Sequence, residues 1–350
     1  RTKKSPVSVF AGLSAGAINS TALAIHADDL RKGAARLSDI WSSLTPYRVY
    51  RTDFPKLATL GVRWIKDLAS GGVLGRSRSN FLLDTAPLRE LLEREMDVAR
   101  LPDNIANSTL RGVAVSATNY LTGSTVTFYD GESQIKPWVR RGRIASREPI
   151  TVDHVMASAA IPMFFPPVSI GGKVFGDGGV RMTTPVSPAI HLGADKIIAV
   201  GIRYYRSVEN TIALNRDTFA NDVSIAQIAG VLLNAVFLDS LDNDIERLER
   251  INRTLSFIKP EDRARHPDLL RRIPSLSLRP SNDLGRLAAD QYEKFPATLR
   301  HLLRGIGATG DAGWDLLSYV AFQPEYIRKL IELGYQDTVA RAKEIEAFFV

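Results

Sequence analysis

With 350 residues, of which 45% are hydrophobic and 24% charged, the chain has an ordinary globular composition and enough length for one large domain. The formal net charge of +7 favours anionic surfaces, whether lipid headgroups or nucleic acid, but no nucleic-acid-binding signature accompanies the arginines. The chain has no cysteine, which excludes disulfides and cysteine nucleophiles, and the best apolar stretch, residues 197–202, is far shorter than a membrane-spanning helix.

The first predicted element is a short buried strand over residues 7–11, in which apolar residues alternate along the chain. The segment Gly12-Leu13-Ser14-Ala15-Gly16 follows it and fits G-x-S-x-G, the pattern of a nucleophile elbow. An alanine-rich helix is predicted next. Strand before and helix after are the context that this motif needs, so Ser14 is a candidate nucleophile.

The two glycines of the elbow, Gly12 and Gly16, have an expected physical role. A serine on a sharp strand-to-helix turn needs neighbours without Cβ atoms, because the chain folds back close to itself. Ser14 is expected at the N-terminus of the helix, where free N–H groups favour negative charge. The alternative is an ordinary serine in a glycine-rich turn.

The pattern from the elbow helix to residue 150 predicts helices first and then a pair of strands. Helices are predicted over residues 30–44, 54–69 and 85–96, a glycine-rich loop over 70–80, strands over 111–118 and 124–129, and irregular structure over 130–150. Strands that alternate with helices favour a largely parallel α/β sheet.

The remaining chain divides at about residue 215. Before it we predict a short helix over residues 151–160, a strand over 173–175, a helix over 185–192 and a buried strand over 196–202. After it we predict one long helix over 222–252, strand-like pieces at 255–258 and 276–278 that return to the sheet edge, and mostly helix over 284–350. The expected organisation is an α/β core, residues 1–215, with a helical C-terminal portion, residues 216–350, packed on the same domain.

A serine nucleophile needs a base to take its proton and donors to stabilise the oxyanion. The histidines of the chain are His26, His154, His191, His266 and His301. The last three fit the chain order Ser, acid, His of α/β-hydrolases. None of them follows a clear strand with turn residues around it, so we interpret each as a surface or helix histidine.

Asp177 is a better candidate base. It follows a predicted strand and is bracketed by Gly176, Gly178 and Gly179, which places an acid at the carboxyl end of a strand, where α/β sites lie. A carboxylate is intrinsically too acidic to be a good base, so its site must desolvate it and raise its pKa. The alternative is a tight turn in which the aspartate bonds its own backbone.

Three blocks of the chain, taken together and in order, resemble the patatin-like phospholipases. They are Gly12-Leu13-Ser14-Ala15-Gly16, Ala157-Ser158-Ala159-Ala160-Ile161-Pro162 and Asp177-Gly178-Gly179. The middle block resembles the A-S-x-x-x-P segment of that family, and residues 82–92 and 185–200 resemble its bacterial members. The resemblance covers roughly residues 5–205 and implies a three-layer α/β sandwich with a mostly parallel central sheet.

The resemblance also implies a chemistry, which is hydrolysis of phospholipid or neutral-lipid esters of the phospholipase A or lysophospholipase type. Ser14 would attack the ester carbonyl and Asp177 would take its proton, as a Ser–Asp dyad without metal or cofactor. The amide of Ala15 would donate to the oxyanion. The glycine-rich oxyanion loop of the family precedes the elbow, and residues 1–13 contain no such loop. We therefore expect that the sequence has been trimmed ahead of Arg1.

Two alternatives stay open at this point. One is a catalytically silent patatin-like domain that binds lipid or a partner, and the other is a histidine-using esterase of the ordinary α/β-hydrolase kind. The expected location is the cytoplasm, with peripheral attachment to membranes as a hypothesis. Trp138, which lies close to Arg140 and Arg141, is a candidate for interfacial contact with lipid.

Two other patterns are interpreted as carrying no site. Residues 305–310 match G-x-G-x-x-G, but residues 299–304 before them read as helix, whereas a dinucleotide site needs a strand there. Asp242 and Asp244 resemble part of a calcium loop without its glycine and glutamate, and we expect both to be solvated on a helix face.

Overall fold

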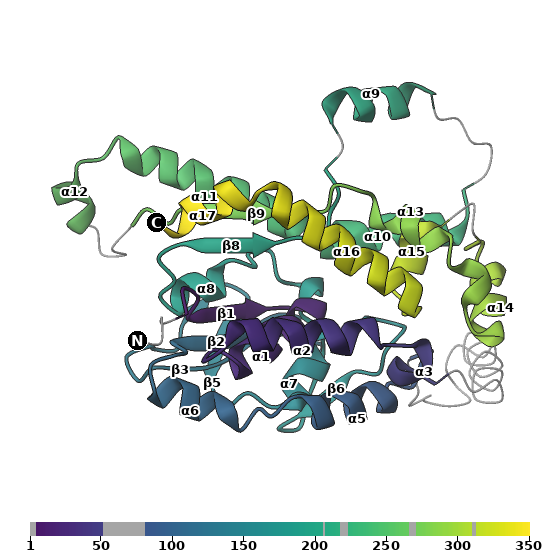
Figure 1. The fold of residues 1–350 in the computed structure, drawn as a ribbon, viewed down its shortest axis with the longest axis horizontal. Helices are drawn as coiled ribbons and strands as arrows, with labels where there is room; N and C mark the ends of the chain where they lie inside the picture. Colours follow the sequence, from purple (N-terminus) through teal and green to yellow (C-terminus); the bar gives the residue numbers. More distant parts are fainter. Residues whose placement is uncertain (1–4, 52–80, 206, 218–222, 266–270, 310–312) are drawn as a thin grey trace.

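A seven-stranded sheet forms the centre of the fold (Figure 1). The computed structural model describes residues 5–51, 81–205, 207–217, 223–265, 271–309 and 313–350, so the helix predicted over 54–69 and the loop predicted over 70–80 lie outside the described residues. The strands of this sheet are β1 (Val9–Gly12), β2 (Gly112–Asn119), β3 (Ser124–Gly131), β4 (Val139–Arg140), β5 (Arg143–Arg147), β6 (Val168–Ile170) and β7 (Lys173–Asp177). Their order is β4-β5-β3-β2-β7-β6, and β1 also pairs with β2.

The sheet is mixed and mostly antiparallel, so the prediction of a mostly parallel sheet was wrong. Only the pairs β1–β2 and β3–β5 are parallel, whereas β2–β3, β2–β7, β4–β5 and β6–β7 are antiparallel. The reason is the length of the connections. Short turns at Gly123, Gly142 and Gly171-Gly172, where every glycine has a positive φ, join consecutive strands as hairpins, and a hairpin leaves no room for a parallel crossover.

Strands β1 and β7 lie end to end along one edge of β2. Strand β3 pairs with every residue of β2 along the other edge. Gly12 lies opposite Val115 and Asp177 lies opposite Ala117, so the two strands end on either side of Ser116. Because β1 runs parallel and β7 antiparallel to β2, their carboxyl ends point toward each other.

Helices and loops bury both faces of β2, and every residue of this strand is buried. The helices associated with this part of the chain are α1 (Ala15–Ile25), α2 (Leu30–Ser42), α3 (Pro46–Val49), α5 (Ala86–Glu95), α6 (Arg100–Ala106), α7 (Val152–Ser158) and α8 (Ser187–His191). Val113, Val115 and Ala117 contribute to the main core, whereas Ala114 joins a smaller cluster with Leu192 on the opposite face. This two-sided burial explains the apolar character of the strand.

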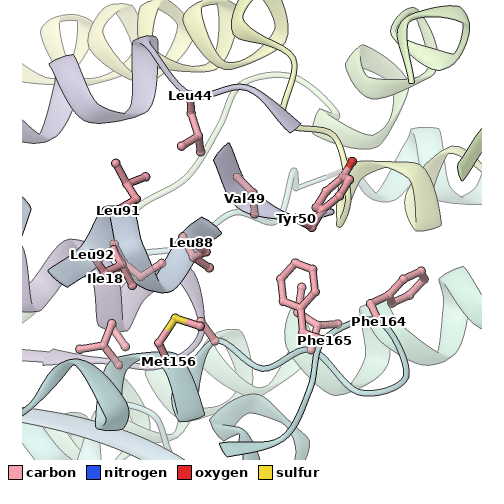
Figure 2. Close-up of a cluster of buried hydrophobic side chains, with 14 of the residues drawn as sticks. Ile18, Leu44, Val49, Tyr50, Leu88, Leu91, Leu92, Met156, Phe164 and Phe165 are labelled. Atoms are coloured by element: carbon pink, nitrogen blue, oxygen red, sulfur yellow. The ribbon is translucent and has the colours of Figure 1, made fainter. Parts of the chain in front are cut away.

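The main core gathers side chains from several helices around the sheet (Figure 2). The labelled residues are Ile18, Leu44, Val49, Tyr50, Leu88, Leu91, Leu92, Met156, Phe164 and Phe165. The Tyr50 hydroxyl donates to the carbonyl oxygen of Val320 at 3.0 Å, and its ring lies edge-on to Phe322 at 6.0 Å between centroids. Residues from the C-terminal portion therefore complete the core that the N-terminal helices begin.

The C-terminal portion is mostly helical, as predicted, with one small sheet. Its helices are α9 (Val208–Asp217), α10 (Ile225–Phe237), α11 (Asp239–Ser256), α12 (Pro260–Ala264), α13 (Leu284–Ala289), α14 (Ala297–Gly305), α15 (Trp314–Ser318), α16 (Pro324–Ala340) and α17 (Ala342–Phe349). The strands predicted near residues 196–202 and 276–278 form β8 (Ile197–Val200) and β9 (Ser275–Leu278), which pair in parallel as a separate two-stranded sheet. They do not return to the edge of the main sheet.

Several local predictions were wrong for identifiable reasons. The piece at 255–258 is not a strand, because Leu255 continues the buried stripe of α11. Residues 130–150 are irregular only in part, since they include β4 and β5. Trp138 is not available to lipid, because it is buried and stacks on His191 with ring centroids 4.5 Å apart. Asp244 is buried as well, and it accepts a hydrogen bond from the Val186 amide.

The apolar character of helix α10 was also underestimated from the sequence. Its 13 residues include no charged side chain, although Gln227 and Asn234 interrupt the apolar residues. Together with α11 it makes a helical segment, Ile225–Ser256, that passes a test of length and composition for crossing a membrane. Only 11% of the most apolar window of that segment is buried, which is unusual for a core helix.

Candidate active site

The elbow serine has a strained backbone. Ser14 lies between β1 and α1 with φ 53° and ψ −133°, a conformation that side-chain-bearing residues rarely adopt. A Cβ atom on Gly12 would lie 2.1 Å from the carbonyl oxygen of Gly16, so the close return of the chain is real at this position. Gly16 differs, because nothing lies within 4 Å of a Cβ built there. Only the first of the two glycines is required by the turn itself.

The Ser14 hydroxyl and the Asp177 carboxylate are in direct contact. Ser14 Oγ donates to Asp177 Oδ2 at 2.6 Å, although 163 residues separate them in the chain. The contact follows from the sheet, since β1 and β7 end on either side of Ser116 and each leads directly into one of these two residues. The hydroxyl is thereby held by a group that can accept its proton.

Three further hydrogen bonds hold Asp177 in place. Its Oδ1 accepts from the Gly179 amide at 2.8 Å, its carbonyl accepts from Thr118 Oγ1 at 2.8 Å, and its own amide donates to the Ala160 carbonyl at 3.0 Å. The aspartate does bond its own following backbone, as the alternative of a tight turn expected, and it contacts Ser14 at the same time. Both carboxylate oxygens have a donor.

Burial gives this carboxyl group an unusual acidity. Asp177 is 0% exposed, and desolvation raises its pKa from an ordinary 3.8 to about 7, against the smaller lowering effects of the Ser14 hydroxyl and the Gly179 amide. A carboxylate with a pKa near neutrality is a far better proton acceptor at physiological pH than an exposed aspartate.

Ser158 connects the elbow to the central strand. It is completely buried, accepts a hydrogen bond from the Ser14 amide at 3.0 Å, and donates its own proton to the Ser116 carbonyl at 2.6 Å. A Cβ atom on Gly178 would lie 2.1 Å from that same carbonyl oxygen. The carbonyl of Ser116 therefore contacts the middle block and the Asp177 loop at the point where β1 and β7 meet.

Aromatic side chains surround the aspartate loop. The Phe237 ring, at the end of α10, fills the space beside Gly179. A Cβ atom on Gly179 would lie 2.3 Å from Cδ1 of this ring. Phe237 also packs on Tyr319, with ring centroids 5.7 Å apart. Tyr120 occupies the corresponding space at Gly176. These contacts explain both the glycines that flank Asp177 and the exclusion of water from it.

The described histidines have other partners. His26 Nδ1 lies 3.0 Å from an Arg100 guanidinium nitrogen, and His154 Nδ1 accepts from the Thr151 amide at the start of α7. His191 stacks on Trp138, and burial lowers its pKa to about 4. His301 is an exposed residue of α14, and His266 lies outside the described residues. The Ser14 hydroxyl donates to a carboxylate rather than to any of these rings.

Some residues of the site were missed at the sequence level. Ser158 was noted only as part of a block, and Ser116 and Thr118 were not noted at all. A signal existed for the last two, because they are alternate polar residues in an otherwise apolar strand, which places them on one face. Phe237 carried no usable signal, since its approach to Gly179 depends on how α10 packs. Ala15, the predicted oxyanion donor, is the exposed first residue of α1, where a helical N–H has no intrahelical acceptor.

Comparison with known proteins assigns the chain to a family. The model of the patatin-like phospholipase family matches residues 3–190, which is more than half of the chain and includes the elbow, the middle block and the Asp177 loop. The chain therefore belongs to the patatin-like phospholipase family, whose members are typically lipid acyl hydrolases. A search of curated proteins gave no match.

The two elbow glycines should respond differently to the same substitution. We expect Gly12→Ala to lower the free energy of unfolding by about 2 to 3 kcal/mol, because its methyl group meets the Gly16 carbonyl. Gly16→Ala is the matched control and should change stability by less than about 1 kcal/mol, since it adds a helix-favouring residue in open space. Urea unfolding of both variants measures this. Equal losses would contradict the turn geometry described here.

Loss of the Ser158 hydroxyl should destabilise the fold. Ser158→Ala leaves the Ser14 amide and the Ser116 carbonyl without a partner in a buried setting, which costs about 1 to 3 kcal/mol. Ser169→Ala, at an exposed position of β6, should stay within about 0.5 kcal/mol of the parent chain. Urea unfolding checks both, and similar values for the two variants would argue against the role given to Ser158.

The raised pKa of Asp177 predicts a pH-dependent gain of stability on removing its charge. The folded-state pKa of about 7 lies above the unfolded value of 3.8, so ionisation costs folding stability as pH rises between these values. Asp177→Asn should therefore stabilise the protein increasingly from pH 4 to pH 7 and level off above, at about 4 kcal/mol at most. Unfolding at a series of pH values measures the difference. A gain that does not change with pH would contradict the assigned burial.

Proposed function

We propose that this protein is a serine acyl hydrolase that cleaves fatty-acyl esters of phospholipids or related lipids, of the phospholipase A or lysophospholipase type. The observation that carries the proposal is the 2.6 Å hydrogen bond from Ser14 Oγ to Asp177, a fully buried carboxylate with a pKa near 7. Membership in a family of lipid acyl hydrolases supports the substrate class.

In the proposed reaction, Ser14 and Asp177 act as a dyad. Ser14 Oγ attacks the ester carbonyl while Asp177 Oδ2 accepts the hydroxyl proton, and the tetrahedral intermediate collapses when that proton passes to the leaving alcohol. The acyl group then stays on Ser14 as an ester. Water attacks this ester with Asp177 again taking the proton, and the fatty acid leaves as the Ser14 hydroxyl is restored.

The oxyanion needs donors near the Ser14 hydroxyl. We propose the amide of Ala15 as one of them, because the first N–H groups of α1 have no intrahelical acceptor and the helix dipole favours negative charge there. The Ser14 amide is already engaged with Ser158, so it contributes by fixing the elbow rather than by binding the oxyanion. The expected absence of a glycine-rich loop stays a prediction.

Labelling with a fluorophosphonate probe, together with hydrolysis of a soluble short-chain ester, tests this proposal. We expect the parent chain to be labelled, and Ser14→Ala to lose labelling and hydrolysis. Asp177→Asn should reduce the hydrolysis rate by about 10²- to 10⁴-fold, the usual contribution of a general base. Ser169→Ala serves as the matched control and should behave as the parent chain. If folded parent protein is neither labelled nor active, the dyad proposal fails and a silent lipid- or partner-binding domain takes its place.

A further inference from the structure

Helix α10 presents an apolar stripe to the surface. The stripe consists of Ile225, Ile228, Val231, Leu232 and Ala235, which recur at helical spacing and are all exposed. Its four large side chains are between 52% and 67% exposed. A row of large apolar side chains on one helix face differs from scattered exposed residues and marks an interaction surface.

The opposite side of α10 fixes the helix to the body of the protein. Ala226 is fully buried and its amide donates to the Ile306 carbonyl, while Gly230 lies against Asp315 of α15. A Ser224–Gln227 capping box holds the first turn. The exposed stripe therefore belongs to a helix that is already anchored.

The C-terminal end of α10 contacts the loop that follows Asp177. Phe237, the last residue of α10, lies against Gly179, two residues beyond Asp177. Figure 1 shows α10 above the main sheet, beside α13 and α15.

Charge favours an anionic surface for the stripe. Helix α10 has no charged residue, and the chain as a whole carries a net charge of +7. The carbonyl of Ile306 accepts a hydrogen bond from the Ala226 amide in the first turn of α10. Arg304, an exposed residue of α14, comes two positions before Ile306, so its positive charge lies near this turn. An apolar helix face on a protein of net positive charge is suited to lying on an anionic lipid surface.

The length of α10 favours lying on a membrane over crossing it. Its 13 residues span roughly 20 Å, whereas the hydrocarbon core is about 30 Å thick. The segment that continues it, α11, has Asp239 and Asp242 in its first turn and a buried face made of Ile245 and Leu248. Such a helix belongs to the body of the protein and not to a lipid interior.

We propose that the α10 stripe docks on the surface of an anionic phospholipid membrane and thereby places the dyad at the lipid. The functional role of this docking rests on the proposed lipid-ester hydrolysis, whereas binding of the stripe to the membrane surface does not require catalysis. The bound protein would insert the stripe into the interface and keep its other face on the protein body.

Vesicle flotation tests the proposal, using protein that carries Ser14→Ala so that lipid is not consumed. We expect the protein to bind vesicles of phosphatidylcholine with phosphatidylglycerol, and to bind vesicles of phosphatidylcholine alone more weakly. The triple change Ile225→Asp, Ile228→Asp and Val231→Asp should weaken binding at least tenfold, because three apolar side chains that would enter the lipid interface become charged. Tyr335→Asp with Val339→Asp, at exposed positions of α16, is the matched control and should bind as before. Thermal unfolding confirms that each variant is folded.

A fluorescent label tests insertion of the stripe without adding negative charges to it. The chain has no cysteine, so Ile228→Cys and Val339→Cys each provide one labelling site for an environment-sensitive nitrobenzoxadiazole probe. On adding anionic vesicles, emission should increase and shift to the blue at position 228 and remain unchanged at position 339.

Three outcomes would overturn the proposal. They are equal binding by the stripe variants, equal responses of the two labels, and a dimer of the parent protein that the stripe variants convert to a monomer without loss of vesicle binding. The last result would assign the stripe to a second copy of the chain. Failure of the hydrolase proposal is seen separately, as absence of soluble-ester hydrolysis by the parent chain.

Discussion

The geometry of the site depends on two strands that end against each other at Ser116. Strand β1 approaches this residue from one side and β7 from the other, both along the same edge of β2. Each strand continues directly into a functional group, the elbow in one case and the Asp177 loop in the other. Register along β2 therefore fixes the distance between the Ser14 hydroxyl and the Asp177 carboxylate. A slip of one residue in either strand would turn the side chains of that strand to the opposite face of the sheet.

Burial of Asp177 is both a cost to folding and the source of its basicity. Among the described residues, the Ser14 hydroxyl and the Gly179 amide are the donors to its two carboxylate oxygens, and these two hydrogen bonds do not offset the loss of water. The surrounding contacts maintain that state, since the Phe237 ring covers the loop and Thr118 holds its backbone. A buried carboxylate of this kind is maintained at the expense of folding stability, and the rest of the fold must offset that cost.

The same covering helix connects the buried site to the surface. Phe237, the last residue of α10, covers the Asp177 loop and excludes water from it. The exposed face of the same helix is apolar. A single helix thus has two apolar sides with different partners. In the proposed account, the inner side raises the pKa of the carboxyl and the outer side meets the lipid.

The elements nearest to the site were predictable from sequence because they are encoded locally. The G-x-S-x-G pattern placed Ser14 between strand and helix, and the glycines around Asp177 marked a close approach of backbone. Sheet direction was predicted wrongly, since alternation of elements was weighed above the short turns that require hairpins.

Long-range features of the site had no local signal. The position of Phe237 over Gly179 depends on tertiary contacts of α10, and Ser158 looks like any small residue in its helix. Gly16 shows the opposite error. Its place in the motif suggested that a side chain would not fit there, but a Cβ atom at this position has no neighbour within 4 Å. What a sequence encodes through one turn or one strand could be predicted, whereas contacts between distant segments required the fold.

The proposed reaction depends on removal of the Ser14 proton by buried Asp177. The most direct test is the pH dependence of the second-order rate at which a fluorophosphonate inactivates the protein. The account predicts that this rate increases with pH through an apparent pKa of about 7 and then levels off, and that the step disappears in Asp177→Asn. A step near pH 4, or a step that persists in Asp177→Asn, would contradict it.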